Sequence, residues 1–290
     1  MRATFLPALA LLVATTTAQA AGLQEGWAGR KQAVTLPNGV TLRYVEAGPA
    51  DGPPLILLHG LTDTSRSWSM TLPLLERKYH VLIPDQRGHG ASDAPACCYA
   101  IPDFAGDLVA LMDAKGIARA TVVGHSMGGF IAQYTAIAYP ERVDRLVLVA
   151  TGASGVGNQT LDWVLEQART LTQPIDPKSK FIEEWTSNPN PVDAVFLEHV
   201  KPETARTPPQ TWTGATLGLI VEDHRHLLPR VRAPVLILWG DQDPILPEAS
   251  QKLLREALPG AEYKVYEKAG HNLPWEQPEQ VAQDIIGFVP

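Results

Sequence analysis

The segment Gly124 to Gly129 (GHSMGG) presents a serine in a setting that could make it a nucleophile. It follows an apolar TVV run and precedes a helix-like stretch, so Ser126 is expected at a tight turn between a strand and a helix. Glycines permit such a turn because neighbouring chain segments can approach them closely. The pattern predicts a serine that attacks a carbonyl carbon, and a glycine-rich turn with an incidental serine is the less favoured interpretation.

A reaction at a carbonyl group also needs N–H donors for the oxygen atom that becomes negatively charged. His59-Gly60-Leu61 follows a second apolar run, and the backbone N–H of Leu61 is one candidate donor. The N–H of Met127, the residue after the serine, is the other. The His-Gly pair is common in proteins, so His59 is interpreted as structural rather than as an acid or base.

A serine is a weak nucleophile without a base, and a histidine held by a carboxylate can serve as one. His271 lies in a Gly-His-Asn segment near the end of the chain. Asp241 and Asp243 both follow the apolar VLIL run, and spacing alone does not separate them as the acid. The order Ser126, Asp243, His271 is the order expected for a serine at such a turn. A surface-loop histidine is the less favoured interpretation of His271.

The elements that must position these residues alternate between strands and helices. Thr41 to Glu46 alternates apolar and polar residues, as a half-exposed strand does. Short apolar runs that end in Gly, Asp or Pro are typical of strands buried in a parallel sheet. The alternation predicts an α/β sheet wound on both faces, with functional residues where its strands end. The expected strands are 55–58, 81–83, 121–123, 146–149 and 235–238, and the expected helices are 104–115, 130–139, 248–257 and 281–288.

One stretch, residues 154–229, breaks this alternation and is called the insertion below. It contains eight of the 25 prolines and three of the seven tryptophans, and no strand pattern. Amphipathic fragments at 161–171, 178–185 and 192–200 alternate with prolines, which predicts a helical cap over the sheet. The aromatic residues of the cap are expected to form mainly its own small core, with one or two facing a substrate, and Trp185 and Trp212 are the candidates for that role. The set is Trp163, Phe181, Trp185, Phe196 and Trp212.

The first twenty residues resemble a cleaved secretory leader. Met1-Arg2 starts the chain, Phe5 to Ala14 is apolar, and Ala18-Gln19-Ala20 has the small-residue pattern of a cleavage site. The apolar run is shorter than the roughly 20 residues that a membrane span needs. These features predict a periplasmic or secreted protein that starts at Ala21, is soluble, and keeps no stable membrane anchor. The predicted organisation is therefore leader 1–20, core 21–153, cap 154–229 and core 230–290.

The two cysteines, Cys97 and Cys98, are adjacent. Their Cα atoms are about 3.8 Å apart across a trans peptide, below the usual range for a disulfide. Two loop thiols are therefore the favoured interpretation, and a vicinal disulfide is the alternative. Neither cysteine has neighbours that indicate a metal site.

Composition narrows the function classes. With 45% hydrophobic and 19% charged residues in 290, the chain can bury a large core, which excludes disorder. The net charge is −7 and no basic run occurs, so nucleic acid is not expected as a partner. A small-molecule substrate fits this composition better.

Taken together, these motifs resemble the α/β-hydrolase fold superfamily, in the branch with a helical cap inserted after the sixth strand. The resemblance spans about residues 35–288. It is carried by His59-Gly60, the segment 85–92 (DQRGHGAS), 124–129, 140–143 (PERV), 240–244 and Gly270-His271. It implies a mostly parallel, eight-stranded sheet, with Ser126 as nucleophile, His271 as base, and Leu61 and Met127 as oxyanion donors. It also implies Asp243 rather than Asp241 as the acid.

The resemblance leaves several chemistries open. Relatives that are epoxide hydrolases or haloalkane dehalogenases have an aspartate where Ser126 stands, which excludes them. Esterases, lactonases, carbon–carbon bond hydrolases and cofactor-free perhydrolases all keep the serine triad, and the fold does not choose among them. We expect hydrolysis of a small or medium carboxylic ester or lactone through an acyl-enzyme, with no metal or organic cofactor. A perhydrolase or carbon–carbon hydrolase is the alternative, and a non-catalytic binding protein is disfavoured.

Overall fold

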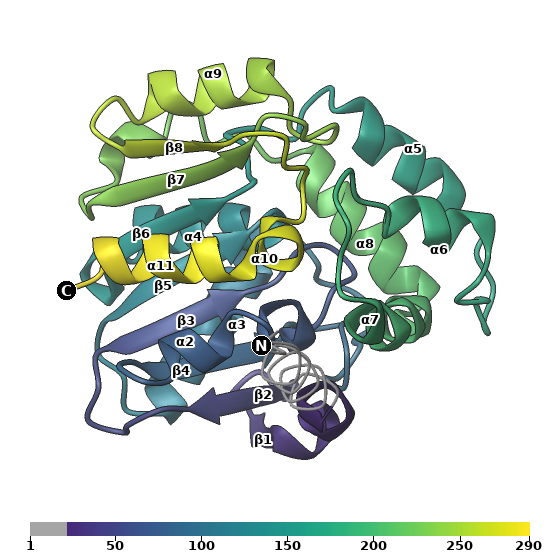
Figure 1. The fold of residues 1–290 in the computed structure, drawn as a ribbon, viewed down its shortest axis with the longest axis horizontal. Coiled ribbons are helices and arrows are strands. Elements are labelled where there is room, and N and C mark those ends of the chain that lie inside the picture. The colour runs from purple at the N-terminus through teal and green to yellow at the C-terminus, as the bar shows by residue number, and fades with distance from the viewer. Residues whose placement is uncertain (1–21) are drawn as a thin grey trace, which may run out of the picture.

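The structure of the chain is a computed structural model that describes residues 22–290 (Figure 1). The predicted leader, residues 1–20, lies outside the described residues. No helix within 22–290 is both long enough and apolar enough to cross a membrane.

Eight strands form one sheet in the order β1-β2-β4-β3-β5-β6-β7-β8. Strand β2 runs antiparallel to its neighbours β1 and β4, and all the other pairs are parallel. The mostly parallel sheet expected from the sequence is confirmed. The strands are β1 (Lys31–Thr35), β2 (Thr41–Ala47), β3 (Pro54–Leu58), β4 (His80–Asp85), β5 (Ala120–His125), β6 (Val143–Val149), β7 (Val235–Gly240) and β8 (Glu262–Tyr266).

Two of these strands, β1 and β8, have no counterpart among the strands predicted from apolar runs. Both lie at the edges of the sheet, and most of their residues are exposed or half-buried. An edge strand that packs little of its surface does not need an apolar run, so its sequence carries a weak signal. The five apolar runs and the alternating stretch 41–46, which were predicted as strands, all lie within observed strands.

Helices cover both faces of the sheet, and each face has its own apolar core. In β3, Ile56 packs on the side of α3 and α4, whereas Leu55 and Leu57 pack on the side of α2 and α11. Figure 1 shows α2 and α11 in front of the sheet. The core helices are α2 (Leu72–Leu75), α3 (Ile101–Ala114), α4 (Met127–Ala138), α9 (Glu248–Ala257), α10 (Leu273–Glu276) and α11 (Pro278–Phe288).

The insertion follows β6, the sixth strand, and its four helices gather on one side of the sheet (Figure 1). Helix α7 runs beyond its predicted end at Val200 despite Pro202, and α8 was not predicted. Pro209 starts α8 at a position where no backbone N–H is needed. Gly214 and Gly218 weaken its helical signal, but both pack directly on Tyr99. The helices are α5 (Gln159–Ala168), α6 (Lys180–Trp185), α7 (Ala194–Arg206) and α8 (Pro209–Ile220); the domain limits at 154 and 229 stay a prediction.

Cys97 and Cys98 are joined in a disulfide, so the favoured interpretation of two thiols is wrong for this structure. The pair lies in an exposed loop between β4 and α3. The backbone at Cys98 has φ of 74°, a left-handed conformation that turns the chain sharply at the pair.

Candidate active site

Ser126 occupies the turn between β5 and α4, as the motif predicts. Its backbone has φ of 53° and ψ of −117°, a conformation rare for a residue with a side chain. Its N–H donates to the carbonyl oxygen of Val149 at 3.0 Å. A Cβ atom on Gly124 would overlap the carbonyl of Gly128, and one on Gly128 would lie 2.5 Å from the carbonyl oxygen of Leu58. The glycines therefore let β5, α4 and β3 close around the serine.

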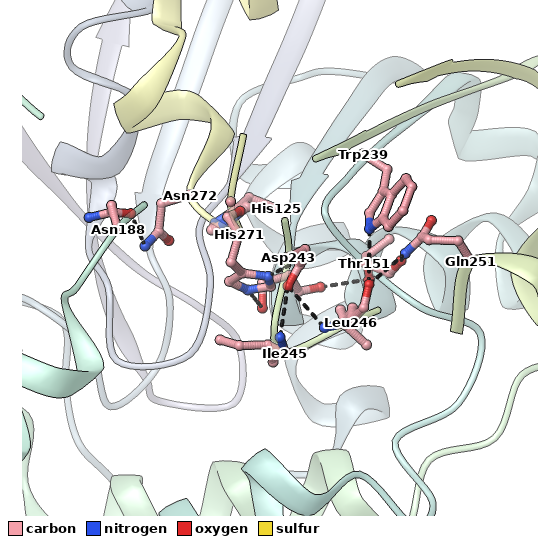
Figure 2. Close-up of polar contacts among 12 residues, drawn as sticks. His125, Thr151, Asn188, Trp239, Asp243, Ile245, Leu246, Gln251, His271 and Asn272 are labelled. Atoms are coloured by element: carbon pink, nitrogen blue, oxygen red, sulfur yellow. Dashed lines mark hydrogen bonds and ion pairs between the residues drawn. The ribbon is translucent and has the colours of Figure 1, made fainter. Parts of the chain in front are cut away.

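His271 connects Ser126 to Asp243. Its Nε2 lies 2.9 Å from Ser126 Oγ. Its Nδ1 lies 2.9 Å from Oδ2 of Asp243, and both residues are labelled in Figure 2. Because a carboxylate only accepts, Nδ1 carries the proton and Nε2 is left to accept the serine hydroxyl proton. The three residues that the sequence placed in one triad are therefore brought together in the order that the chemistry requires.

The carboxyl of Asp243 is held ionised by its surroundings. Burial acts to raise its pKa, but His271 and the N–H groups of Leu246 and Ile245 hold that pKa below its usual value. Both N–H groups donate to Oδ1 at 2.9 Å, which leaves Oδ2 for the histidine (Figure 2). An ionised, fixed acceptor of this kind keeps the imidazole in one tautomer and one orientation.

Asp241, the competing acid, is exposed and points elsewhere. Its Oδ1 accepts from the N–H of Lys268 at 2.6 Å and makes no recorded bond to His271 in the described chain. Asp241 thus supports the loop between β8 and α10 that carries the histidine. Spacing could not separate the two aspartates because both follow β7, and only the turn at Gly240 to Asp243 directs one of them inward.

The two predicted oxyanion donors flank Ser126. A Cβ atom on Gly60 would lie 3.2 Å from Ser126 Cβ, so the loop that carries Leu61 touches the serine. Met127 opens α4, where first-turn N–H groups lack partners within the helix. Within residues 22–290, neither the N–H of Leu61 nor that of Met127 donates to another protein atom. Both remain free for a ligand oxygen beside Ser126.

Two histidines close to the site are buried and uncharged. His59 Nε2 accepts from the N–H of Gln86 at 3.0 Å, and its Nδ1 donates to the carbonyl of Gly60 at 2.8 Å. Burial lowers the pKa of His59 to about 3 and, with the nearby His271, that of His125 to about 3. His59 therefore shapes the Gly60 loop rather than exchanging protons, as interpreted from the sequence.

A cavity of about 530 Å³ opens above Ser126 and His271, lined by both the core and the insertion. Of the aromatic residues expected in the cap, Trp163 and Trp185 line this cavity, whereas Trp212 and Phe196 are fully buried away from it. The indole of Trp185 also donates to Thr62 Oγ1 at 2.8 Å, beside Leu61. Further lining residues were not predicted from the sequence, because they lie on loops or short helices without a motif: Asp63, Glu184, Asn188 and Trp275. Asn272, which follows His271 in the Gly-His-Asn segment, also lines the cavity.

The loop between α6 and α7 forms hydrogen bonds and packing contacts with the loop that carries His271. Asn190 Nδ2 donates to the carbonyl of Lys268 at 2.6 Å and to Glu276 Oε2 at 2.7 Å. Asn272 donates to Asn188 Oδ1 at 2.8 Å (Figure 2). Gly270 packs on Pro189 so closely that a Cβ atom would lie 2.5 Å from the ring. The insertion thus contacts the loop that carries His271 directly.

In a comparison with known families, residues 53–278 match the model of the alpha/beta hydrolase fold, in agreement with the observed fold. The chain belongs to the α/β-hydrolase fold family and is a hydrolase of that fold. It is similar to 3-oxoadipate enol-lactonase 2 of Acinetobacter baylyi, with 31% identity over 83% of this chain and 90% of that protein. It is also similar to a non-heme chloroperoxidase of Streptomyces lividans, with 28% identity over 88% and 98%. The crystal structure of a hydrolase from Pseudomonas aeruginosa superposes with a TM-score of 0.82 at 26% identity, covering 90% of this chain and 99% of that one.

Proposed function

We propose that the protein hydrolyses small or medium carboxylic esters or lactones through an acyl-enzyme on Ser126. The observation that carries this proposal is the hydrogen-bonded series Asp243–His271–Ser126, which ends in a cavity beside two free backbone N–H groups. A similar enol-lactonase adds support, because opening a lactone is the same acyl transfer within one molecule.

The proposed acylation step uses the observed geometry. Ser126 Oγ attacks the carbonyl carbon while His271 Nε2 takes the hydroxyl proton, and Asp243 stabilises the imidazolium that results. The carbonyl oxygen becomes an oxyanion that accepts from the N–H groups of Leu61 and Met127. The carbon–oxygen bond to the alcohol then breaks, and His271 returns its proton to the departing oxygen. In a lactone, that alcohol stays attached to the acyl chain.

Deacylation repeats these roles with water. His271 removes a proton from a water molecule, whose oxygen attacks the acyl carbon, and the proton is then delivered to Ser126 Oγ. One water is consumed, and the products are one carboxylic acid and one alcohol. The chain's own residues supply every proton acceptor and donor in this scheme.

The test uses residues 21–290 with nitrophenyl butyrate and δ-valerolactone as substrates. We expect turnover of at least one of them, loss of that turnover in Ser126→Ala, and a single fluorophosphonate adduct on Ser126 by mass spectrometry. A protein that neither turns over an ester or lactone nor reacts with the fluorophosphonate would overturn the proposal.

Perhydrolysis is a second candidate, favoured by the similarity to a non-heme chloroperoxidase. It would use the same acyl-enzyme, with hydrogen peroxide taking the place of water and a peracid as product. Formation of peracetic acid from acetate and hydrogen peroxide, lost in Ser126→Ala, would support this candidate. Ester turnover without peracid formation would exclude it.

A further inference from the structure

The cavity is lined by acidic side chains and, within the described residues, by no lysine or arginine. The acidic residues are Asp63 and Glu184. The other ionisable side chains that line it are those of His125 and His271. Electrostatic complementarity inside a cleft acts on the charge of whatever enters it.

Asp63 contributes a carboxyl close to the reacting serine. It is buried, and its Oδ2 would lie 3.1 Å from a Cβ atom on Gly60, the residue that touches Ser126. One ionisable neighbour is His125, whose Nδ1 lies 3.8 Å from Oδ2. Because burial keeps His125 uncharged, it gives Asp63 no positive partner.

The protonation of Asp63 changes within the neutral range. Burial raises the pKa of Asp63 to about 7, although a hydrogen bond from Ser67, the nearby His271 and a bond from the backbone of Gly60 act to lower it. Asp63 is therefore largely ionised at about pH 8, on the floor of the cavity.

Glu184 contributes a second carboxylate at the mouth of the cavity. It lies on α6, with a side chain that is 50% exposed and 3.5 Å from Lys180 Nζ, which is itself 88% exposed. An exposed pair of this kind is weak, so Lys180 cancels the charge of Glu184 only in part. The same cavity is also lined by three tryptophans, Trp163, Trp185 and Trp275. Indole rings attract cations as well as apolar groups.

We infer that this site selects its ester or lactone by charge. It takes substrates that are neutral or carry an ammonium group, and it disfavours those that carry a free carboxylate besides the reacting ester or lactone group. Asp63 and Glu184 are the specificity-determining residues. The inference rests on the proposed function, since it names the substrate class of the same site.

The test compares nitrophenyl esters of matched shape at about pH 8. The acyl groups are 4-(trimethylammonio)butanoyl, its uncharged isostere 5,5-dimethylhexanoyl, and the glutaric half-ester, each rate being divided by that of hydroxide hydrolysis. We expect kcat/KM of the cationic ester to be about tenfold above that of its uncharged isostere, and kcat/KM of the isostere to be about tenfold above that of the anionic half-ester. A factor of this size corresponds to unit charges about 7 Å apart at a dielectric between those of protein and water. Butyrylcholine and its uncharged isostere, 3,3-dimethylbutyl butyrate, repeat the comparison with the charge on the alcohol group.

Three variants assign the effect to residues. Asp63→Asn and Glu184→Gln should each compress the spread between cation and anion, and salt should weaken the contribution of the exposed Glu184 more than that of the buried Asp63. Glu183→Gln is the matched control, because Glu183 lies on the same helix, pairs with Lys201 at 2.6 Å and does not line the cavity. It should leave the spread unchanged.

The outcomes separate this inference from the proposed function. Suppose that the uncharged ester is hydrolysed through Ser126, and that the half-ester has the same kcat/KM as its uncharged isostere once each is divided by the rate of hydroxide hydrolysis. Charge selection is then wrong, and the hydrolase assignment stands. A spread that survives both Asp63→Asn and Glu184→Gln would overturn the assignment to these residues. Loss of all ester and lactone turnover would instead count against the proposed function.

Discussion

Ser126 is held in a backbone conformation that costs about 1–3 kcal/mol for a residue with a side chain. The surrounding chain maintains it through the bond from its N–H to Val149 and the close approach of Gly128 to Leu58. As a consequence Oγ faces His271 instead of packing against the sheet. At the scale of single residues, strain and close packing therefore position the proposed nucleophile.

The two aspartates after β7 give a sharp test at the same scale. Asp243→Asn should lower kcat by about 10⁴-fold with folding retained, because the imidazolium loses its counter-charge and its tautomer is no longer fixed. Asp241→Asn, which affects only the bond to Lys268, should cost far less. Steady-state kinetics and circular dichroism of both variants decide this, and the reverse ranking would contradict the assignment of the acid.

Among the elements, the α6–α7 loop has the most direct effect on the site. Asn188, Pro189 and Asn190 contact the segment 268–276 on both sides of His271. Because this loop belongs to the insertion, the insertion does more than cover the cavity. It also fixes the segment on which the orientation of the imidazole depends.

Asn190→Ala tests this positioning role. It removes the donors to Lys268 and Glu276, so we expect kcat for every ester and the rate of fluorophosphonate labelling to fall together by about tenfold, with KM little changed. Lys178→Ala, an exposed change elsewhere in the insertion, is the control. Normal labelling in Asn190→Ala would show that the loop is merely packed there.

Two tryptophans of the insertion should separate binding from folding. Trp163 lines the cavity, so Trp163→Ala should alter chain-length preference by about 10–200-fold while labelling of Ser126 changes little. Trp212 is fully buried against Phe181, so Trp212→Ala should lose about 3–5 kcal/mol of stability and affect all substrates alike. The measurement is an ester chain-length series with thermal unfolding; a changed preference in Trp212→Ala without lost stability would refute this division. Trp185 is a poorer probe because its indole also binds Thr62.

For the whole molecule, the parallel sheet collects the site at one edge. Gly60 follows β3, Ser126 follows β5, Asp243 follows β7 and His271 follows β8, so every functional group lies beyond the carboxyl end of a strand. This is where ligands bind in open α/β sheets.

Burying histidines without charge makes the whole fold sensitive to acid. Burial lowers the pKa values of His59, His89 and His125 from 6.5 to about 3, 4 and 3. As the pH falls through about 6.5, these histidines bind protons in the unfolded chain but not in the folded chain. The contribution to stability is therefore full above that pH, and it falls below it by about 1.4 kcal/mol per pH unit for each histidine. Asp63 has the opposite effect on stability. Because its pKa is raised from 3.8 to about 7, the folded chain keeps a proton on Asp63 between these pH values that the unfolded chain has lost, and this offsets the effect of one histidine.

Urea unfolding at about pH 7.5 and 5.5 measures this effect. The free energy of unfolding should be lower at the acid pH, and Asp63→Asn should steepen the loss because it removes the opposing group. Equal stability at the two pH values would contradict the account of the buried histidines.

Export is the remaining prediction at the scale of the whole chain. We propose that the leader 1–20 directs the protein to the periplasm or the medium and is removed before Ala21. Expression of the full chain in a bacterium, followed by fractionation and N-terminal sequencing, tests this. Soluble cytoplasmic protein that retains Met1 would refute it.

The sequence by itself determined the α/β class and the turn at Ser126, and it predicted His271 as the base, because these depend on local patterns. Apolar runs predict buried strands, and a tight strand-to-helix turn needs glycines in fixed places such as Gly124 and Gly128. It left the acid open between Asp241 and Asp243, and only resemblance to a family chose between them.

Tertiary structure alone decided which of these groups meet and what surrounds them. Edge strands β1 and β8 and helix α8 lack strong local signals, since packing against the rest of the molecule stabilises them. The cavity carboxyls Asp63 and Glu184 lie more than a hundred residues apart and share no motif. Their common charge acts on one ligand because the order of strands in the sheet and the path of the insertion bring them to one cavity, and neither property is written in any short segment of the chain.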